Sequence, residues 1–61
     1  MPLVNIKMYE GRSKEQKKEI AKRITEVIHE VVDVSEEYIW IVFEDIPKRA
    51  MAIAGKFGDE D

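Results

Sequence analysis

The 61-residue sequence contains no cysteine and only one histidine. Without cysteine there are neither disulfides nor thiolate metal ligands, and a single histidine has no second nitrogen or sulfur ligand with which to hold a structural zinc ion. A domain of this length buries only about 60% of the surface that its unfolded chain exposes, so its core is marginal. Small domains gain stability from disulfides, from metals or from oligomerisation. We therefore expect an oligomer without a metal.

The sequence also lacks a long apolar run and an excess of basic charge. Ten Lys and Arg residues are interleaved with thirteen Asp and Glu residues, for a net charge of −3, so a nucleic acid would find no uniformly positive surface. No apolar stretch approaches the roughly 20 residues of a membrane span, and no signal-peptide core follows the first residues. We expect a cytoplasmic protein that binds neither nucleic acid nor membrane.

Hydrophobic periodicity predicts a strand followed by a helix. Residues 2–8 alternate between apolar and polar in the manner of a strand, whereas the apolar residues within 14–33 recur at spacings of three and four, which gathers them on one helix face. Ser13 and Gln16 have the spacing of a capping box, so the helix should begin at residue 14.

The opposite face of this helix is polar. Two pairs of opposite charge have the (i, i+4) spacing that suits a solvated helix surface, namely Glu19 with Arg23 and Lys22 with Glu26. We interpret this face as solvated and His29 as an exposed helix residue rather than a ligand or a catalyst.

Residues 38–46 read YIWIVFEDI and predict a second strand, because β-branched and aromatic residues dominate both of its faces. Two strands joined by a helical crossover form a right-handed βαβ unit with parallel strands, which are usually covered on both faces. One helix covers one face, so another copy of the chain should cover the second. After Pro47, small and apolar residues between glycines indicate a short hairpin arm that cannot fold alone.

None of the familiar nucleophile, phosphate-loop or metal-binding motifs is present in this sequence. Pro2 directly follows Met1, and removal of Met1 would convert the Pro2 nitrogen from an amide into a free secondary amine. Free α-amino groups titrate near pH ~8, and burial or nearby cations lower the pKa toward the range of a good general base. From the residues alone, Pro2 is either such a base or simply the first residue of a strand. If Met1 is retained, the base is absent.

Several motifs in the chain together resemble the 4-oxalocrotonate tautomerase family. They are Pro2 after the initiator methionine, a short strand, EGRS at residues 10–13, EQK at residues 15–17, and AIAGK at residues 52–56, which is similar to the family's C-terminal hairpin. The resemblance implies one tautomerase domain over residues 1–61, of the α+β class. Its β-α-β subunit with a C-terminal hairpin would pair into a dimer with a four-stranded sheet and two helices, and three dimers would form a hexamer.

The resemblance also implies a function. The protein would be an isomerase, a keto–enol tautomerase without cofactor or metal, that moves a proton in an enolic or α,β-unsaturated keto acid with the Pro2 amine as general base. Arg12 matches the family arginine that binds a carboxylate of the small-molecule substrate. A planar guanidinium suits that role because it donates two parallel hydrogen bonds to a carboxylate.

Two positions depart from the family's pattern. Trp40 stands where better-known members have a second substrate-binding arginine, and Met51 replaces an aromatic residue of the hairpin. An indole can stack on a conjugated acid and donate one N–H, but it supplies no charge. We therefore expect a substrate with one carboxylate, with Lys48 or Arg49 as candidates to replace the missing cation. Trp40 could instead serve only to pack an interface.

Two other functions are open from the sequence. A dehalogenase or hydratase would use the same proline together with a carboxylate that activates water, for which Glu44 and Asp45 are the candidates. A non-catalytic oligomeric scaffold would have kept the fold and lost the activity. Turnover of a simple enol acid by the wild type and by Pro2→Ala separates these functions.

Overall fold

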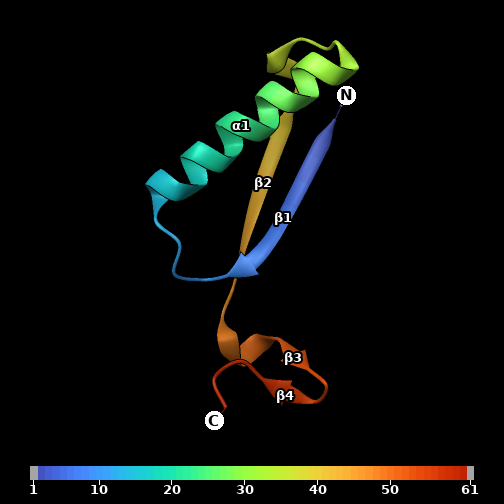
Figure 1. Ribbon diagram of the computed structural model, residues 1–61. Coiled ribbons are helices and arrows are strands. Elements are labelled where there is room, and N and C mark those ends of the chain that lie inside the picture. Colours follow the sequence, from blue (N-terminus) through green and yellow to red (C-terminus); the bar gives the residue numbers. More distant parts are fainter. Residues whose placement is uncertain (1, 61) are drawn as a thin grey trace.

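The computed structural model describes residues 2–60 as a strand-helix-strand body followed by a small arm (Figure 1). The predicted order of strand, helix, strand and hairpin is confirmed. The elements are β1 (Leu3–Tyr9), α1 (Lys14–Val32), the 3₁₀ turn η1 (Glu36–Tyr38), β2 (Trp40–Ile46), the 3₁₀ turn η2 (Lys48–Ala50), β3 (Ala52–Ile53) and β4 (Lys56–Phe57).

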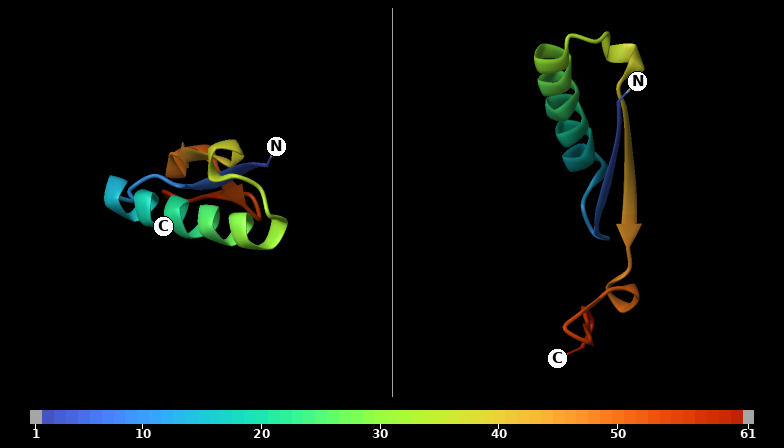
Figure 2. Two further views of the ribbon diagram at one scale, coloured as in Figure 1. Left: turned by 90° about the horizontal axis from the view of Figure 1, so that it is seen from above. Right: turned by 90° about the vertical axis from the view of Figure 1, so that its right-hand side faces the viewer.

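The two long strands pair in parallel, as the βαβ pattern predicts, with Leu3 opposite Trp40 and Tyr9 opposite Ile46. α1 covers one face of this sheet and leaves the other bare (Figure 2). The side chains under the helix are half-buried and include Val4, Ile6, Met8, Ile41 and Phe43. On the bare face Trp40 is 52% exposed and Val42 is 45% exposed. The uncovered face therefore exposes large apolar side chains at the start of the strands.

α1 begins and ends through specific hydrogen bonds. The Gln16 N–H donates to Ser13 Oγ at 3.1 Å and the Ser13 N–H donates to Gln16 Oε1 at 3.0 Å, which completes the predicted capping box. At the other end Asp33 takes a left-handed conformation (φ 62°), and its N–H donates to the His29 carbonyl. His29 is exposed, as predicted, and its Nδ1 lies 2.7 Å from the Val34 carbonyl oxygen. Because a carbonyl only accepts, Nδ1 carries a proton, and the ring helps to close the helix.

The polar face of α1 carries one of the two predicted ion pairs. Arg23 Nε lies 2.7 Å from Glu19 Oε2. This hydrogen bond, and then the charge of Arg23, hold the pKa of the Glu19 carboxyl below its usual value. No ion pair joins Lys22 and Glu26 in the described chain. Within residues 2–60, no helix has the length and apolar character needed to cross a membrane.

The arm extends beyond the end of β2 and away from α1 (Figures 1 and 2). Its hairpin reverses at Ala54 and Gly55, whose φ angles are both positive (54° and 82°), as the tight turns that match the twist of a hairpin require. Ile53 and Phe57 remain 66% and 44% exposed. The hairpin therefore forms within one chain but buries little of its own apolar surface.

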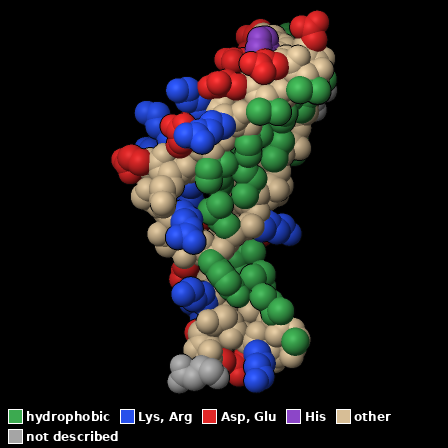
Figure 3. All heavy atoms as spheres, viewed as in Figure 1, with side chains coloured by type: hydrophobic (Ala, Val, Ile, Leu, Met, Phe, Trp, Pro, Cys, Tyr) green, Lys and Arg blue, Asp and Glu red, His purple; other side chains and the backbone are tan. Residues whose placement is uncertain are grey.

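The single chain is less compact than a folded monomer of its length. Its radius of gyration is 14.7 Å, whereas a compact domain of this size has about 10.5 Å. It exposes 5067 Å², compared with about 4,100 Å² for a compact monomer. Among the described residues only Ile39 is buried, and hydrophobic side chains form a band from the upper body to the hairpin (Figure 3). The exposed surface and the extended shape thus give a second reason to expect an oligomer, in addition to the short length of the chain.

Gly58 is the point at which the arm contacts the body. A Cβ on Gly58 would lie 2.7 Å from Tyr9 Oη, 2.9 Å from Tyr9 Cζ and 3.3 Å from Lys48 Cβ. Gly58→Ala should therefore displace the end of the half-buried Tyr9 side chain and lower the free energy of unfolding by about 1 kcal/mol, the low end of the cost of overpacking. Urea denaturation at a fixed protein concentration measures this change. In a Tyr9→Leu background the same substitution should cost less, and an equal cost in both backgrounds would contradict the steric explanation.

Candidate active site

Pro2 lies beside Trp40 at the start of the sheet. The Trp40 N–H donates to the Pro2 carbonyl at 3.0 Å, so the strand pairing itself holds these two residues together. Pro2 is half-buried. In the full 61-residue sequence Met1 acylates the Pro2 nitrogen, which therefore becomes basic only when Met1 is removed.

The ring of Trp40, rather than its indole N–H group, is available for contact with another molecule. The indole Nε1–H donates to the Glu37 carbonyl at 3.3 Å, so this donor already has a partner in its own chain. The ring lies on the bare sheet face, opposite Leu3 in the register. Trp40 can therefore offer a flat apolar surface next to Pro2, whereas the sequence suggested its N–H as the polar contact.

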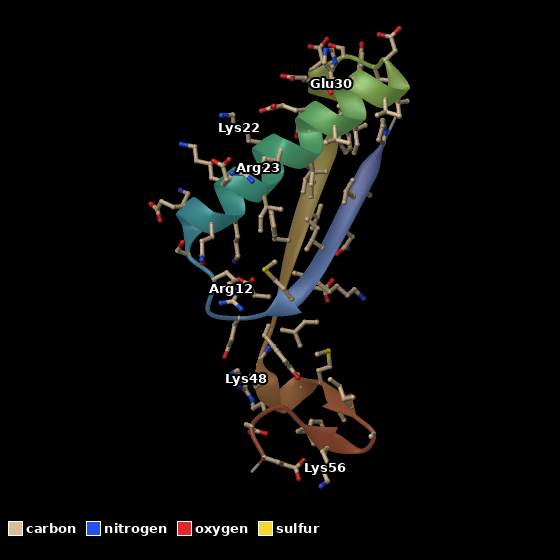
Figure 4. The ribbon with its side chains drawn as sticks, in the orientation of Figure 1. Arg12, Lys22, Arg23, Glu30, Lys48 and Lys56 are labelled. Atoms are coloured by element: carbon tan, nitrogen blue, oxygen red, sulfur yellow. The ribbon has the colours of Figure 1, made fainter. Side chains whose placement is uncertain are left out.

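Arg12 lies at the end of β1 opposite to Pro2, in the loop that leads to α1 (Figure 4). β1 has seven residues and spans about 20 Å at 3.3 Å per residue, so the two residues are far apart in one chain. The loop turns at Gly11, whose φ of 116° favours glycine. Arg12 is exposed and forms no ion pair with any residue of the described chain. Its guanidinium is available to a carboxylate from outside.

Met51 lies in the arm, beyond the same end of the sheet as Arg12. It is half-buried, and its carbonyl accepts a hydrogen bond from the Gly58 N–H at 3.3 Å. Lys48 and Arg49 precede it in η2, are exposed, and form no ion pair within residues 2–60. Figure 4 shows Lys48 below Arg12 at the junction of body and arm.

The predicted site residues thus form two groups at opposite ends of the sheet, Pro2 with Trp40 and Arg12 with Met51. Two surface hollows of about 390 and 310 Å³ lie along α1, and none of these four residues lines either of them. A site that contains both groups requires more than one copy of the chain.

The two carboxylates considered for activating water lie near the Arg12 end of β2. Asp45 is engaged in an ion pair with Lys17, which the sequence did not reveal. Glu44 is exposed on the bare face, opposite Lys7 in the register. Neither carboxylate lies beside Pro2 in its own chain. Within residues 2–60 no three His, Asp or Glu side chains are grouped so that they could hold a metal ion.

Sequence comparison relates this chain to a family of enzymes. A family model described as "Tautomerase enzyme" matches residues 2–59. The 2-hydroxymuconate tautomerase of Bacillus subtilis is 43% identical over 56 residues, which are 92% of this chain and 90% of that protein. A probable tautomerase of Halalkalibacterium halodurans is 41% identical over 56 residues, which are 92% of each chain.

Comparison with solved structures agrees with these matches. YwhB, described as a homologue of 4-oxalocrotonate tautomerase, has a TM-score of 0.89 and 39% identity over 98% of this chain and all of that one. A heterohexameric 4-oxalocrotonate tautomerase of Chloroflexus aurantiacus has a TM-score of 0.90 and 30% identity over 98% of this chain and 97% of that one. The predicted α+β fold and the resemblance noted from the motifs are both confirmed.

Proposed function

The chain belongs to the tautomerase family, and from this premise we propose that it isomerises enolic or α,β-unsaturated keto acids with the Pro2 amine as general base. The observation that carries the proposal is the position of Pro2, which is half-buried and held beside Trp40 by a backbone hydrogen bond. Freed of Met1, the secondary amine takes a proton from the substrate hydroxyl or carbon and returns it to another carbon. The reaction is a net isomerisation, so it consumes no oxidant or reductant.

The experiment that tests this function is turnover of a monocarboxylic enol acid such as phenylenolpyruvate. The protein sample is first shown by intact mass to lack Met1. Ketonisation well above the rate in buffer supports the proposal. A correctly processed and assembled protein that does not accelerate the reaction would overturn it.

Arg12 binds the substrate carboxylate in this proposal. It is exposed, without an ionic partner among residues 2–60, on a loop that reverses at Gly11. A bidentate guanidinium–carboxylate pair would both orient the substrate and place a positive charge near the amine, which favours the neutral form of the amine. Since Arg12 and Pro2 lie at opposite ends of β1, the Arg12 of each site comes from another copy.

The assembly proposed is a hexamer, a trimer of dimers. The apolar side chains on the bare sheet face, the exposed hairpin and the extended shape of one chain all require partners, and one solved relative is described as a heterohexamer. Dimers with a four-stranded sheet would extend the two strands seen here.

Sedimentation should show the hexamer, with no folded monomer at micromolar concentration, because each chain lacks a sufficient core of its own. Circular dichroism on the same dilution series checks whether helix is lost together with assembly. A stable folded monomer would remove both the hexamer and any site shared between copies.

The substrate class is proposed from Trp40. An indole ring adds stacking area but no charge, so the site is expected to bind one carboxylate through Arg12. The Bacillus subtilis relative is named for 2-hydroxymuconate, which has two carboxylates. Such a diacid is therefore the natural comparison substrate.

Wild-type enzyme should have a kcat/KM for a monocarboxylic enol equal to or above that for a diacid. Trp40→Arg should shift the preference toward the diacid by about 10- to 100-fold, since hydrogen bonds to charged groups contribute about 1.5–3 kcal/mol. Trp40→Phe, which keeps a ring without adding charge, is the matched control and should leave the preference unchanged. A hundredfold preference of the wild type for the diacid would indicate that Lys48 or Arg49 binds the second carboxylate.

The dehalogenase or hydratase alternative has less support. Asp45 is paired with Lys17, and Glu44 forms no ion pair among residues 2–60. Glu44 lies toward the Arg12 end of the sheet, so it would reach Pro2 only from another copy, and no ion pair within residues 2–60 orients its carboxylate.

A further inference from the structure

The ion pair between Lys17 and Asp45 joins two elements that are 28 residues apart in the sequence. It connects the first turn of α1 to the end of β2. The Lys17 side chain is 22% exposed and that of Asp45 is 43% exposed. The other ion pair in the described chain, Glu19 with Arg23, lies within α1 and is more exposed, at 52% and 76%. Of the two ion pairs within residues 2–60, only Lys17–Asp45 ties the helix to the sheet.

The loop between β1 and α1, which carries Arg12, is anchored at both ends by backbone donors. The Glu10 N–H donates to the Ile46 carbonyl at 3.0 Å, which ties the start of the loop to β2. The Ser13 N–H donates to Gln16 Oε1 at 3.0 Å, which ties the end of the loop to α1. The orientation of the loop therefore depends on how α1 and β2 are placed relative to each other.

The Lys17–Asp45 pair connects these two anchors. Lys17 directly follows Gln16 on the helix, and Asp45 directly precedes Ile46 on the strand. The two hydrogen bonds from backbone donors and the ion pair thus form a closed frame around the loop. Arg12 lies in this loop, at the end of the sheet nearest the arm (Figure 4).

We propose that the Lys17–Asp45 ion pair is a positioning device for Arg12, in addition to any contribution to stability. The proposal rests on the function proposed above, in which Arg12 binds the substrate carboxylate. With the frame closed, the loop backbone that carries Arg12 is held in place before the substrate arrives. With the frame open, the same contact requires ordering of the loop, which weakens binding.

The test measures kcat and KM for phenylenolpyruvate in Lys17→Met, Asp45→Asn and the exchanged double variant Lys17→Asp/Asp45→Lys. Each single variant should raise KM about tenfold and change kcat by less than about threefold, because binding is lost more than proton transfer. The exchanged pair should recover most of the loss. Glu19→Gln opens the other ion pair of the chain and is the matched control, with KM unchanged.

Arg12→Ala supplies the second control. In that background Asp45→Asn should have no further effect on KM, because no guanidinium remains to be positioned. If Asp45→Asn lowers the melting temperature but leaves KM unchanged, the pair is only structural and the proposal fails. It also fails if Lys17→Met raises KM while Asp45→Asn does not, since Lys17 itself would then contact the substrate.

These measurements distinguish a failure of the positioning role from a failure of the proposed function. If the wild type does not turn over enol acids, or if Arg12→Ala leaves KM unchanged, the proposed function is wrong and this inference falls with it. If Arg12→Ala raises KM and neither variant of the ion pair does, the proposed function stands and only the positioning role is refuted.

Discussion

Replacing Pro2 with alanine in protein that lacks Met1 should lower kcat by about 100-fold or more, because a positioned general base contributes about 10²- to 10⁴-fold to a proton transfer. The alanine variant keeps a primary amine, but its basicity and its position at the start of β1 change. Because the base must be neutral, the kcat/KM of the wild type should rise with pH and level off above the pKa of the amine. Steady-state kinetics across pH, on samples of known mass, measures both effects.

A sample that retains Met1 is the sharper control for this prediction. Its Pro2 nitrogen is an amide and cannot accept a proton, while every side chain of the protein is unchanged. Activity should therefore follow the fraction of chains that lack Met1. A fully retained sample with the activity of a processed one would exclude Pro2 as the base.

Two impaired variants, Pro2→Ala and Arg12→Ala, should regain activity when they are unfolded together and allowed to reassemble. The two residues lie about 20 Å apart along one strand, so each site takes Pro2 from one copy and Arg12 from another. With equal amounts and random mixing, about one quarter of the sites receive both native residues. The measured quantity is kcat/KM of the mixed assembly relative to the wild type, because Pro2→Ala lowers kcat and Arg12→Ala raises KM.

The control for complementation is the same pair of variants refolded separately and then combined, which should keep the low kcat/KM of the separate variants for as long as the subunits do not exchange. Activity no higher in the mixed assembly than in this control would place Pro2 and Arg12 of one chain in the same site. The long separation along β1 would then have to be bridged by a rearranged chain.

Features set by neighbouring residues could be predicted from the sequence. The Ser13–Gln16 capping box and the alternation along β1 both depend on contacts within a few residues. The parallel pairing followed from the length of the helical crossover. The second strand begins two residues later than predicted, at Trp40, because Tyr38 belongs to the turn that leads into it.

Features set by distant residues could not be predicted. Nothing in the local sequence connects Lys17 with Asp45, since their pairing depends on how the helix lies across the sheet. The same holds for the contact between Tyr9 and Gly58. The partner of the Trp40 indole N–H, the Glu37 carbonyl, is close in sequence. It could not be predicted either, because the contact depends on a turn that the strand-like pattern of residues 38–46 does not indicate.

The candidate site was predicted from motifs rather than from geometry. Pro2 and Arg12 stood out because of their neighbours in the sequence, and the strand between them already implied that one chain keeps them apart. How two copies of the chain bring Pro2 and Arg12 together depends on the surfaces through which the copies contact each other. These surfaces are exposed in the single chain.

Trp40 is the only tryptophan of the sequence, and it lies half exposed on the bare face of the sheet, beside Pro2. The emission of an indole depends on the polarity around its ring, so the molecule carries one optical probe at the place where assembly and catalysis are proposed to meet. Its fluorescence reports the environment of that face without a label. Burial by a second copy would change this fluorescence as the protein concentration rises. Stacking of a conjugated acid on the ring would change it as the ligand concentration rises.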